Sequence, residues 1–104
     1  MDIQIDTHTL LRAKERGTNE TEIKEVINDG FIIGSKYGRI GKAKIYEFKQ
    51  NRLNNYYEQK RVEVFFIIEN NKIITVTVYV FYGKWEVEIW ILPTMIKQIY
   101  YISG

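Results

Sequence analysis

The sequence predicts an α+β domain in which two N-terminal helices pack on an antiparallel sheet of four to five strands. Within residues 8–30, two short stretches repeat apolar residues at helical spacing, and each stretch is followed by a glycine. Within residues 61–82, two runs of β-branched and aromatic residues flank Asn70 and Asn71, which tolerate the positive φ angles of a tight turn. The helices are therefore expected first, and the central hairpin of the sheet follows them.

The first helix is expected over residues 8–16. Thr7 or Asp6 can cap its first turn, and Gly17 follows at the position where a left-handed residue ends a helix. At 100° per residue, one side of this helix carries a histidine and two arginines. This basic stripe consists of His8, Arg12 and Arg16.

The second helix follows at once and is expected to end at Asp29 and Gly30. Asn19, with Glu22 three residues later, forms a capping-box pattern at its start. Its apolar stripe consists of Ile23, Val26 and Ile27. The two helices are therefore predicted to form a helical hairpin.

Two strands are expected next, Phe31 to Ile33 and Ala43 to Phe48, joined by a turn with the sequence GSKYGRIG. Although it is rich in glycine, this turn lacks the strand–turn–helix context and the GK[ST] ending of a phosphate loop. We therefore expect a flexible basic hairpin and not a nucleotide site. The polar residues from Gln50 to Gln59 are expected to form a loop.

In the central hairpin, a two-residue loop is expected to place Glu69 opposite Lys72. One face, almost wholly apolar, then pairs Ile67 with Ile74, Phe65 with Val76 and Glu63 with Val78. The other face is expected to gather the polar side chains, and its members are Lys60, Val62, Val64, Phe66, Ile68, Ile73, Thr75, Thr77 and Tyr79. A three-residue loop would swap the partners between the strands, but the two threonines and the tyrosine would still share a face.

After this hairpin, the chain is expected to turn at Gly83-Lys84 into a last strand, Trp85 to Ile91, that Pro93 ends. The apolar tail over residues 93–104 is predicted to form a short helix through Met95, Ile99 and Ile102. This tail either folds back over the sheet or stays available to a partner protein or to a second copy of the chain, which would give a homodimer.

Composition narrows the class of protein. A chain of 104 residues with 45% hydrophobic and 27% charged residues is typical of a single soluble domain, here residues 1–104. It has no cysteine and one histidine, so we expect no disulfide framework and no thiolate zinc site. We also expect no cofactor. The longest uncharged run has 11 residues, fewer than the roughly 18 that suggest a membrane span, and the start MDIQID lacks a basic n-region. We therefore expect a cytoplasmic protein.

Basic residues concentrate in one segment, residues 36–61. Eight lysines and arginines against two glutamates give this segment a charge of +6, whereas seven basic and eleven acidic residues give the remainder −4. A basic segment in a weakly acidic chain is typical of a phosphate-binding surface, although a solvated face that serves solubility is the alternative. The candidate binding residues are Lys36, Arg39, Lys42, Lys44 and Arg61.

A motif connects these elements. The pattern H-x3-R-A-x2-R-G, which is formed by residues 8–17, precedes a second helix ending in glycine, a lysine before a V-x-V strand, and a strand reading I-T-V-T-V-Y. Over about residues 8–85, the chain resembles small bacterial proteins of the RelE/ParE toxin-like superfamily, in the branch of unknown function that opens with this pattern. The resemblance implies the barnase/EndoU/colicin/RelE-like fold, with helices on one face of an antiparallel sheet. It also implies RNA cleavage without a metal ion and a cognate antitoxin as protein partner.

The same resemblance points to six site residues, namely His8, Arg12, Arg16, Lys60, Thr77 and Tyr79. Cutting RNA within a strand requires a base for the 2′-hydroxyl proton, an acid for the leaving 5′-oxygen, and cations on the phosphate. We expect His8 to be the general base and the two arginines and Lys60 to hold the phosphate. Tyr79 is expected either to stack on a base or to serve as the acid, with Thr77 as a binding residue.

Two other functions remain open. A binding module of the same fold would use the basic hairpin to hold nucleic acid or a protein and would carry out no chemistry, whereas an assembly protein would dock a neighbour through its apolar tail. The candidate residues also have structural explanations. A histidine or arginine on a surface helix often only pairs with a carboxylate, and a threonine or tyrosine on a strand often only covers the sheet.

Overall fold

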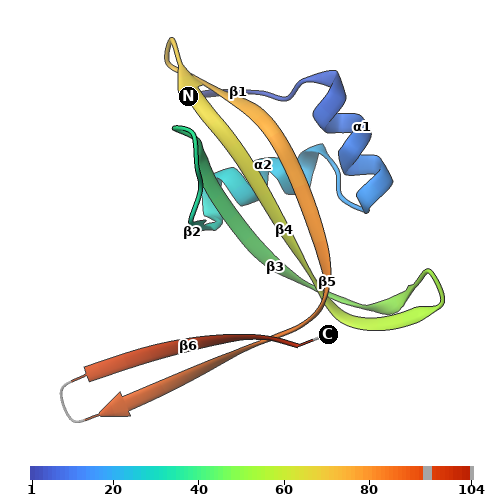
Figure 1. Cartoon of the computed structure of the whole chain (residues 1–104), viewed down its shortest axis with the longest axis vertical. Coiled ribbons are helices and arrows are strands. Elements are labelled where there is room, and N and C mark those ends of the chain that lie inside the picture. The colour runs from blue at the N-terminus through green and yellow to red at the C-terminus, as the bar shows by residue number, and fades with distance from the viewer. Residues whose placement is uncertain (93–94, 104) are drawn as a thin grey trace.

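The computed structural model describes the backbone of residues 1–92 and 95–103 and the side chains of residues 1–85. It confirms the predicted α+β fold, in which two N-terminal helices pack on a five-strand, mostly antiparallel sheet (Figure 1). The elements are β1 (Asp2–Gln4), α1 (Thr7–Arg16), α2 (Glu20–Asp29), β2 (Phe31–Ile33), β3 (Ile40–Arg52), β4 (Asn55–Glu69), β5 (Lys72–Leu92) and β6 (Met95–Ser103). The sheet order is β1-β5-β4-β3-β2, and β6 pairs with the C-terminal part of β5.

Local capping sets the ends of both helices as the sequence predicts. The Asp6 carboxylate accepts the backbone N–H of Thr9 at 2.8 Å at the start of α1, and Gly17 ends this helix with a φ of 95°. Asn19 caps α2, because its side-chain oxygen accepts the N–H of Glu22 at 2.9 Å. These contacts join residues three or four positions apart, which is why the sequence alone predicts them.

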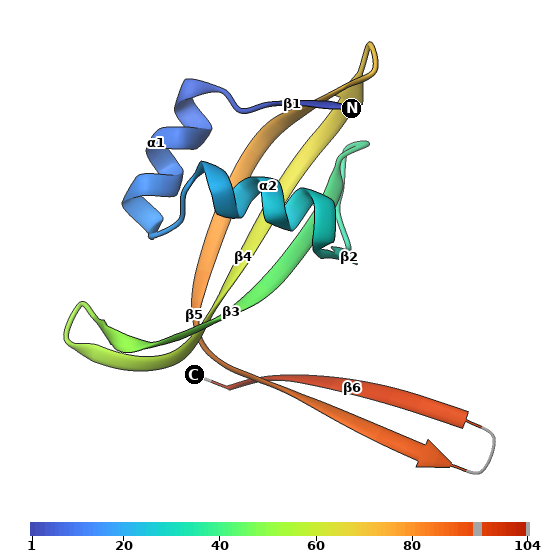
Figure 2. The ribbon, with the colours of Figure 1, turned by 180° about the vertical axis from the view of Figure 1, so that it is seen from behind.

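Both helices lie on the same side of the sheet, which we call the helix face, and the opposite side is the open face (Figure 2). α2 crosses β3 and β4, whereas α1 packs along β5. Fully burying an aliphatic side chain contributes about 1.5–3 kcal/mol, so the core between the two helices and the sheet is the main stabilising element. Its buried members are Ala13, Ile23, Val26, Ile27, Val62, Val64, Phe66 and Val78.

The turn of the central hairpin has the predicted register. Asn70 and Asn71 adopt φ angles of 49° and 62°, as a two-residue turn of this type requires. Glu69 lies opposite Lys72, and the adjacent Ile67–Ile74 pair is also as predicted. The sequence therefore predicts this turn and the first pairs of its strands correctly.

Beyond these pairs, a β-bulge at Val76 shifts the register. Phe66 pairs with Thr75, but the preceding residue of β4, Phe65, pairs with Thr77. Val76 is therefore the extra residue of β5. The predicted pairs of Phe65 with Val76 and of residue 63 with residue 78 are wrong, because each later partner on β5 is displaced by one position.

The bulge separates side chains that the sequence places on one face. Thr75 remains on the helix face and is buried there, whereas Thr77 and Tyr79 lie on the open face. Lys60 pairs with Tyr82 on the helix face. The predicted face shared by Lys60, Thr77 and Tyr79 is therefore wrong, because one extra residue exchanges the two faces of a strand.

β3 and β4 form a longer hairpin than expected. β3 extends beyond the predicted strand from Ala43 to Phe48, and β4 begins at Asn55, so the predicted loop from Gln50 to Gln59 is wrong. Leu53 and Asn54 make a two-residue turn with φ angles of 50° and 70°. The flanking residues are polar because most of this hairpin is exposed, and their composition resembles that of a loop.

The C-terminal part also differs from the prediction. β5 passes through the expected turn at Gly83-Lys84, where Gly83 is buried in the strand opposite Gln59. Residues 95–103 form the strand β6 and not the predicted helix, and the β5–β6 hairpin extends away from the two helices (Figure 1). Pro93 and the side chains of the tail lie outside the described residues. The prediction that the tail serves either as core or as interface therefore falls on residues that are not described. The sequence predicts no element at β1, which pairs in parallel with the start of β5.

Candidate functional site

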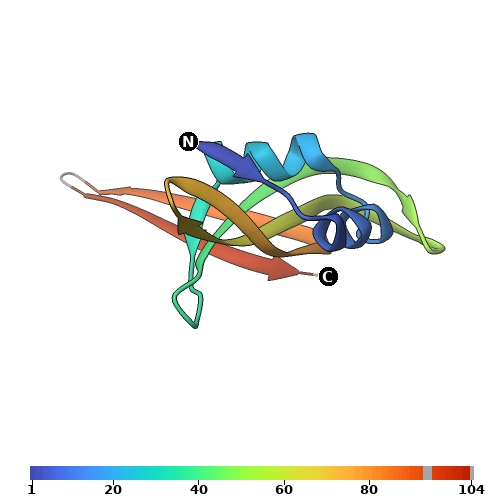
Figure 3. The same cartoon turned by 90° about the horizontal axis from the view of Figure 1, so that it is seen from above.

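A pocket of about 240 Å³ lies on the open face, beside the loop that joins β2 to β3. Figure 3 shows that this loop leaves the sheet on the side away from the helices. The loop contributes Gly34, Ser35, Lys36, Tyr37 and Arg39 to the pocket, and the sheet contributes Phe65, Thr77 and Tyr79. Four residues that the sequence singles out, Lys36, Arg39, Thr77 and Tyr79, therefore lie together.

Arg16 reaches the open face from α1. Its guanidinium donates a hydrogen bond to the Val78 carbonyl and lies 5.1 Å from the centre of the Tyr79 ring. One edge of β5 pairs with β1 at residues 72–74 and with β6 at residues 84–92. Between them, no described strand pairs with this edge, and Arg16 passes around it. The same ring has Phe65 edge-on at 5.9 Å and Phe81 stacked at 6.3 Å. Tyr79 is thus held by a cation and two rings while it stays 41% exposed.

His8 and Arg12 continue the basic stripe toward the N-terminus of α1. Both side chains are exposed, and the Arg12 guanidinium lies 3.2 Å from the Glu15 carboxylate. An exposed pair of this kind contributes little to stability. His8 precedes Arg16 by eight residues, which is about 12 Å along the helix axis. Neither His8 nor Arg12 lines the pocket.

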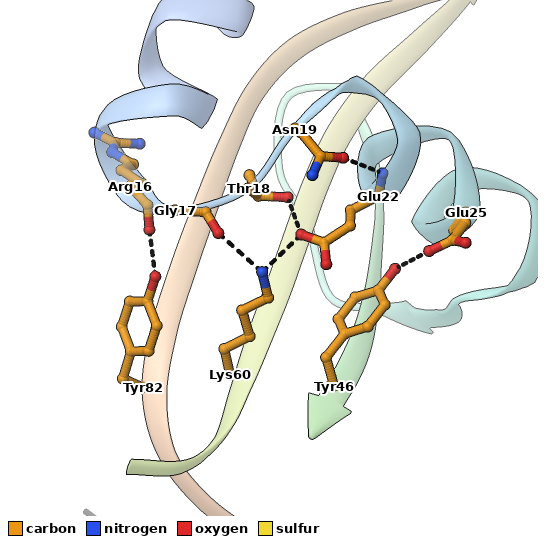
Figure 4. Close-up of polar contacts among 9 residues, drawn as sticks. All are labelled: Arg16, Gly17, Thr18, Asn19, Glu22, Glu25, Tyr46, Lys60 and Tyr82. Atoms are coloured by element: carbon orange, nitrogen blue, oxygen red, sulfur yellow. Dashed lines mark hydrogen bonds and ion pairs between the residues drawn. The ribbon is translucent and has the colours of Figure 1, made fainter. Parts of the chain in front are cut away.

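Lys60, which the sequence assigns to a phosphate, lies instead beneath the junction of the two helices (Figure 4). Its ammonium donates to the Glu22 carboxylate at 2.8 Å and to the Gly17 carbonyl at 2.9 Å. The same carboxylate accepts the Thr18 hydroxyl at 2.8 Å. The side chains of the lysine and the glutamate are only 12% and 18% exposed. Lys60 and Tyr79 therefore lie on opposite faces of the sheet and do not form one site.

Three side chains of the sheet bind the last carbonyls at the C-terminus of α1. The contacts run from Arg52 to the Glu15 carbonyl at 2.9 Å, from Tyr82 to the Arg16 carbonyl at 2.7 Å, and from Lys60 to the Gly17 carbonyl. Such carbonyls lack partners within a helix and carry the negative end of its dipole. Burial raises the pKa of the Tyr82 hydroxyl above 10, so this donor stays protonated to a higher pH than an exposed tyrosine would. These contacts fix the turn from which Arg16 extends.

Sequence reasoning missed Arg52 and Tyr82. Their acceptors are 37 and 66 positions away, so no local pattern joins the donors to the helix end. The Arg52 guanidinium also lies 4.9 Å from the centre of the Tyr82 ring. The only signal in the sequence is Tyr82 itself, which places a hydroxyl at a strand position where a purely apolar side chain would be expected. This signal does not identify the carbonyl that the hydroxyl binds.

The two lysines predicted on β3 lie on the helix face. Lys42 donates to the Ile27 carbonyl at 2.8 Å, near the end of α2. Lys44 lies 5.3 Å from the ring centre of Tyr46, whose pKa is raised by burial and by its hydrogen bond to Glu25. Neither lysine lines the pocket.

Arg61 is the predicted binding residue of β4 that does lie on the open face. Its guanidinium donates to the Glu63 carboxylate at 2.9 Å and lies 5.3 Å from the ring centre of Phe31. The arginine and the glutamate are 15% and 17% exposed. The charge of Arg61 is therefore paired with a carboxylate, and its guanidinium lies beside an aromatic side chain of this face.

Lys36 and Arg39 differ from these cations. Both are exposed, and neither side chain has a hydrogen-bond or ion-pair partner among residues 1–85. No carboxylate lines the pocket beside them. The pocket is therefore a positively charged surface with aromatic walls.

No group of three or more histidine, cysteine, aspartate or glutamate side chains in the described part of the chain could hold a metal ion. Neither α1 nor α2 has the length and apolar character needed to cross a membrane.

Comparisons with known proteins add no relative. No protein-family model matches the chain, and neither curated proteins nor solved structures give a match. The molecule is a small α+β protein with two N-terminal helices and a five-strand mixed sheet.

Proposed function

We propose that this protein binds a single strand of RNA across the open face of its sheet and cleaves it without a metal ion, as a toxin-like endoribonuclease. The observation that carries the proposal is the pocket in which Lys36 and Arg39, unpaired within residues 1–85, lie beside the exposed ring of Tyr79. Proteins hold single strands through cations on the phosphates and aromatic rings on the bases. The resemblance of the opening motif to RelE/ParE-type toxins supports the same function.

Two further arginines extend this surface. Arg16 lies over Tyr79 at the β5 edge, and Arg61 lies over Phe31 toward the β2 edge. The pair of Arg16 and Tyr79 offers a bound phosphate and a stacked base at neighbouring positions. Arg61 already pairs with Glu63 and contributes mainly its contact with the Phe31 ring. A strand bound here would run between the β2–β3 loop and the edge of β5.

His8 is proposed as the general base. It takes the proton of a 2′-hydroxyl, whose oxygen attacks the adjacent phosphorus while the bond to the 5′-oxygen breaks. An acid returns a proton to that oxygen, so the products end in a 2′,3′-cyclic phosphate and a 5′-hydroxyl. Arg12, one helical turn away, is placed to stabilise the charge on the phosphate. Arg16 and Tyr79 lie a further turn along and would hold a neighbouring nucleotide, so stacking is the role proposed for Tyr79.

Incubation of the purified protein with RNA oligonucleotides in the presence of a chelator tests this proposal. We expect fragments with 2′,3′-cyclic phosphate ends. His8→Gln should abolish cleavage but retain RNA affinity, because it removes the proton acceptor and none of the cations. Lys24→Gln, at an exposed position of α2, is the control and should cleave normally. Intact RNA for every substrate, with and without ribosomes, would rule out cleavage.

Binding is tested separately through its salt dependence. RNA affinity, measured by fluorescence anisotropy, should fall steeply as salt increases. Removing Lys36 or Arg39 should lower the slope of log affinity against log salt by about 0.7 for each phosphate that the variant no longer neutralises. A slope that is the same for these variants as for the wild type would show that neither residue contacts a phosphate.

A non-catalytic RNA-binding module is the second candidate, and the position of Lys60 favours it. With Lys60 held by Glu22 on the other face, Arg12 is the nearest remaining cation to His8 on α1, and it contacts Glu15. In that case His8→Gln would leave RNA binding and any effect on growth intact, while reversing the charges in the pocket would remove both.

A cognate antitoxin and a cytoplasmic location belong to the same proposal and rest on the motif resemblance. A short antitoxin-like reading frame beside this one would support them. Co-expression of that frame should then suppress RNA binding or cleavage by the protein.

A further inference from the structure

We infer that the pocket on the open face is a subsite for one nucleotide of the RNA strand. In this arrangement the base packs against Tyr79 and Phe65, its edge meets the Thr77 hydroxyl, and its phosphate lies on Lys36 and Arg39. The inference rests on the proposed RNA binding and adds that the protein discriminates between bases at this position.

The size of the pocket sets the size of the ligand. Its volume of about 240 Å³ is below the range of roughly 300–1,000 Å³ that is typical of sites for drug-sized molecules. It suits a single planar base with part of its sugar. A Cβ atom added at Gly34, which lines the pocket, would meet no atom within 4 Å, so the loop side of the pocket is open to the rest of a strand.

Charge selects an anionic ligand. Arg12, Arg61 and Lys60 all contact carboxylates of the protein, whereas Lys36 and Arg39 have no such partner within residues 1–85. Two uncompensated cations on one short loop repel each other, and a phosphate oxygen between them relieves this repulsion. The phosphate is therefore expected at the loop and the base at the sheet.

The aromatic side chains select a base over other planar groups. Tyr79 and Phe65 present ring surface from neighbouring strands, and Tyr37 stands at the rim with 87% of its surface exposed. Tyr37 and Gly38, with φ angles of 61° and 71°, are the central residues of a turn in which the Arg39 N–H donates to the Lys36 carbonyl. The turn therefore holds the exposed Tyr37 ring beside the pocket that Lys36 and Arg39 also line.

Thr77 supplies the polar group that distinguishes one base from another. Its side chain is half-buried in the pocket wall and makes no hydrogen bond to any residue in the described part of the chain. A hydroxyl donates and accepts, so it can pair with the edge of an unpaired base. Bases in a duplex have both faces and edges occupied, and the subsite therefore takes single-stranded RNA.

The test uses the four nucleoside 5′-monophosphates, with ribose 5-phosphate and inorganic phosphate as probes that lack a base. Binding to the intact protein is followed by NMR chemical-shift titration, and displacement of labelled RNA is followed by anisotropy. We expect at least one nucleotide to bind about tenfold more tightly than ribose 5-phosphate, since stacking on an aromatic ring is a large part of such affinity. The same nucleotide should displace the RNA.

Three variants locate the site. Lys36→Ala/Arg39→Ala should weaken nucleotide binding by about tenfold or more, because hydrogen bonds to charged groups are among the strong ones. Lys14→Ala/Lys24→Ala removes the same charge from exposed helix positions and should change it little. Thr77→Val keeps the shape of the side chain but should narrow the spread of affinities among the four bases. Circular dichroism and the urea midpoint confirm that each variant is folded.

Each result decides a different point. Four nucleotides that bind no better than ribose 5-phosphate, or a pocket variant that binds like the wild type, would overturn the inference. If RNA binds but no mononucleotide displaces it, the subsite is refuted while the proposed RNA binding stands. If mononucleotides bind and RNA does not, the proposed function fails and the pocket serves a free nucleotide, which also overturns the inference as stated.

Discussion

Replacement of Lys60 by methionine distinguishes a structural lysine from a phosphate ligand. Methionine keeps the length and apolar stem of the side chain but removes the ammonium that donates to Glu22 and to the Gly17 carbonyl. The variant then leaves a carboxylate that is only 18% exposed with the Thr18 hydroxyl as its one remaining side-chain donor among residues 1–85. It also removes a cation from the negative end of the α1 dipole.

The expected cost follows from these two losses. Removing one partner of a fully buried ion pair costs about 3–5 kcal/mol, and the residual exposure of this pair reduces that figure. The unpaired Gly17 carbonyl adds about 1 kcal/mol or more. We therefore expect Lys60→Met to lower the free energy of unfolding by about 3 kcal/mol, which for a chain of this length lowers Tm by about 12–15 °C.

Urea denaturation followed by circular dichroism measures this loss. Lys14→Met, an exposed lysine of α1, is the matched control and should change the free energy of unfolding by less than about 0.5 kcal/mol. The double variant Lys60→Met/Glu22→Gln should recover part of the loss, because the unpaired charge is gone. Folded Lys60→Met should bind RNA with an unchanged salt slope. Wild-type stability together with a reduced salt slope would refute this reasoning and return Lys60 to the RNA site.

Other expected outcomes concern α1 and β3. Asp6→Ala should lose about 1 kcal/mol of stability at neutral pH, because the carboxylate caps α1. Hydrogen bonding to Thr9 lowers the pKa of Asp6 below 3.8. Urea titrations should therefore show the full difference in stability between wild type and Asp6→Ala above pH 3.8, and this difference should disappear as the pH falls through the lowered pKa. Asp6→Asn should lack this pH dependence. Gly17→Ala should cost about 2 kcal/mol in urea denaturation, because its φ is 95° and a Cβ would collide with the Tyr82 hydroxyl; an equal urea midpoint would contradict this. Burial raises the pKa of Tyr46, so the stability that it contributes below pH 10 should be lost as the pH rises further, and Tyr46→Phe should remove this loss.

The sequence predicts those features that depend on near neighbours. Asp6, Asn19 and Gly17 act on residues within a few positions, and the Asn70-Asn71 turn depends on the φ angles of two residues. The apolar stripe of α2 is likewise read from its own spacing. The α+β fold follows because two helices with apolar stripes and a set of strands with apolar faces have few ways to bury those surfaces.

Part of the candidate site is also visible in the sequence, but its grouping is not. Lys36, Arg39, Thr77 and Tyr79 are each identified from charge or motif, and the pocket contains all four. The sequence groups Lys60 with Tyr79 because a regular alternation of side chains along β5 takes no account of the bulge. A bulge depends on how two strands and the helix beside them pack, and Val76 itself has no distinguishing feature as a strand residue.

The two helices with their caps, the central turn and the basic segment are all encoded locally, because each depends on residues that are neighbours along the chain. Packing in three dimensions sets which face each polar side chain occupies and which cations are paired with carboxylates. Pairing across strands brings Lys60 to the end of α1 and leaves Lys36 and Arg39 beside Tyr79, without an ionic partner among residues 1–85. These contacts join positions some 40 residues apart, and no local preference encodes them, because they depend on how strands and helices pack in space.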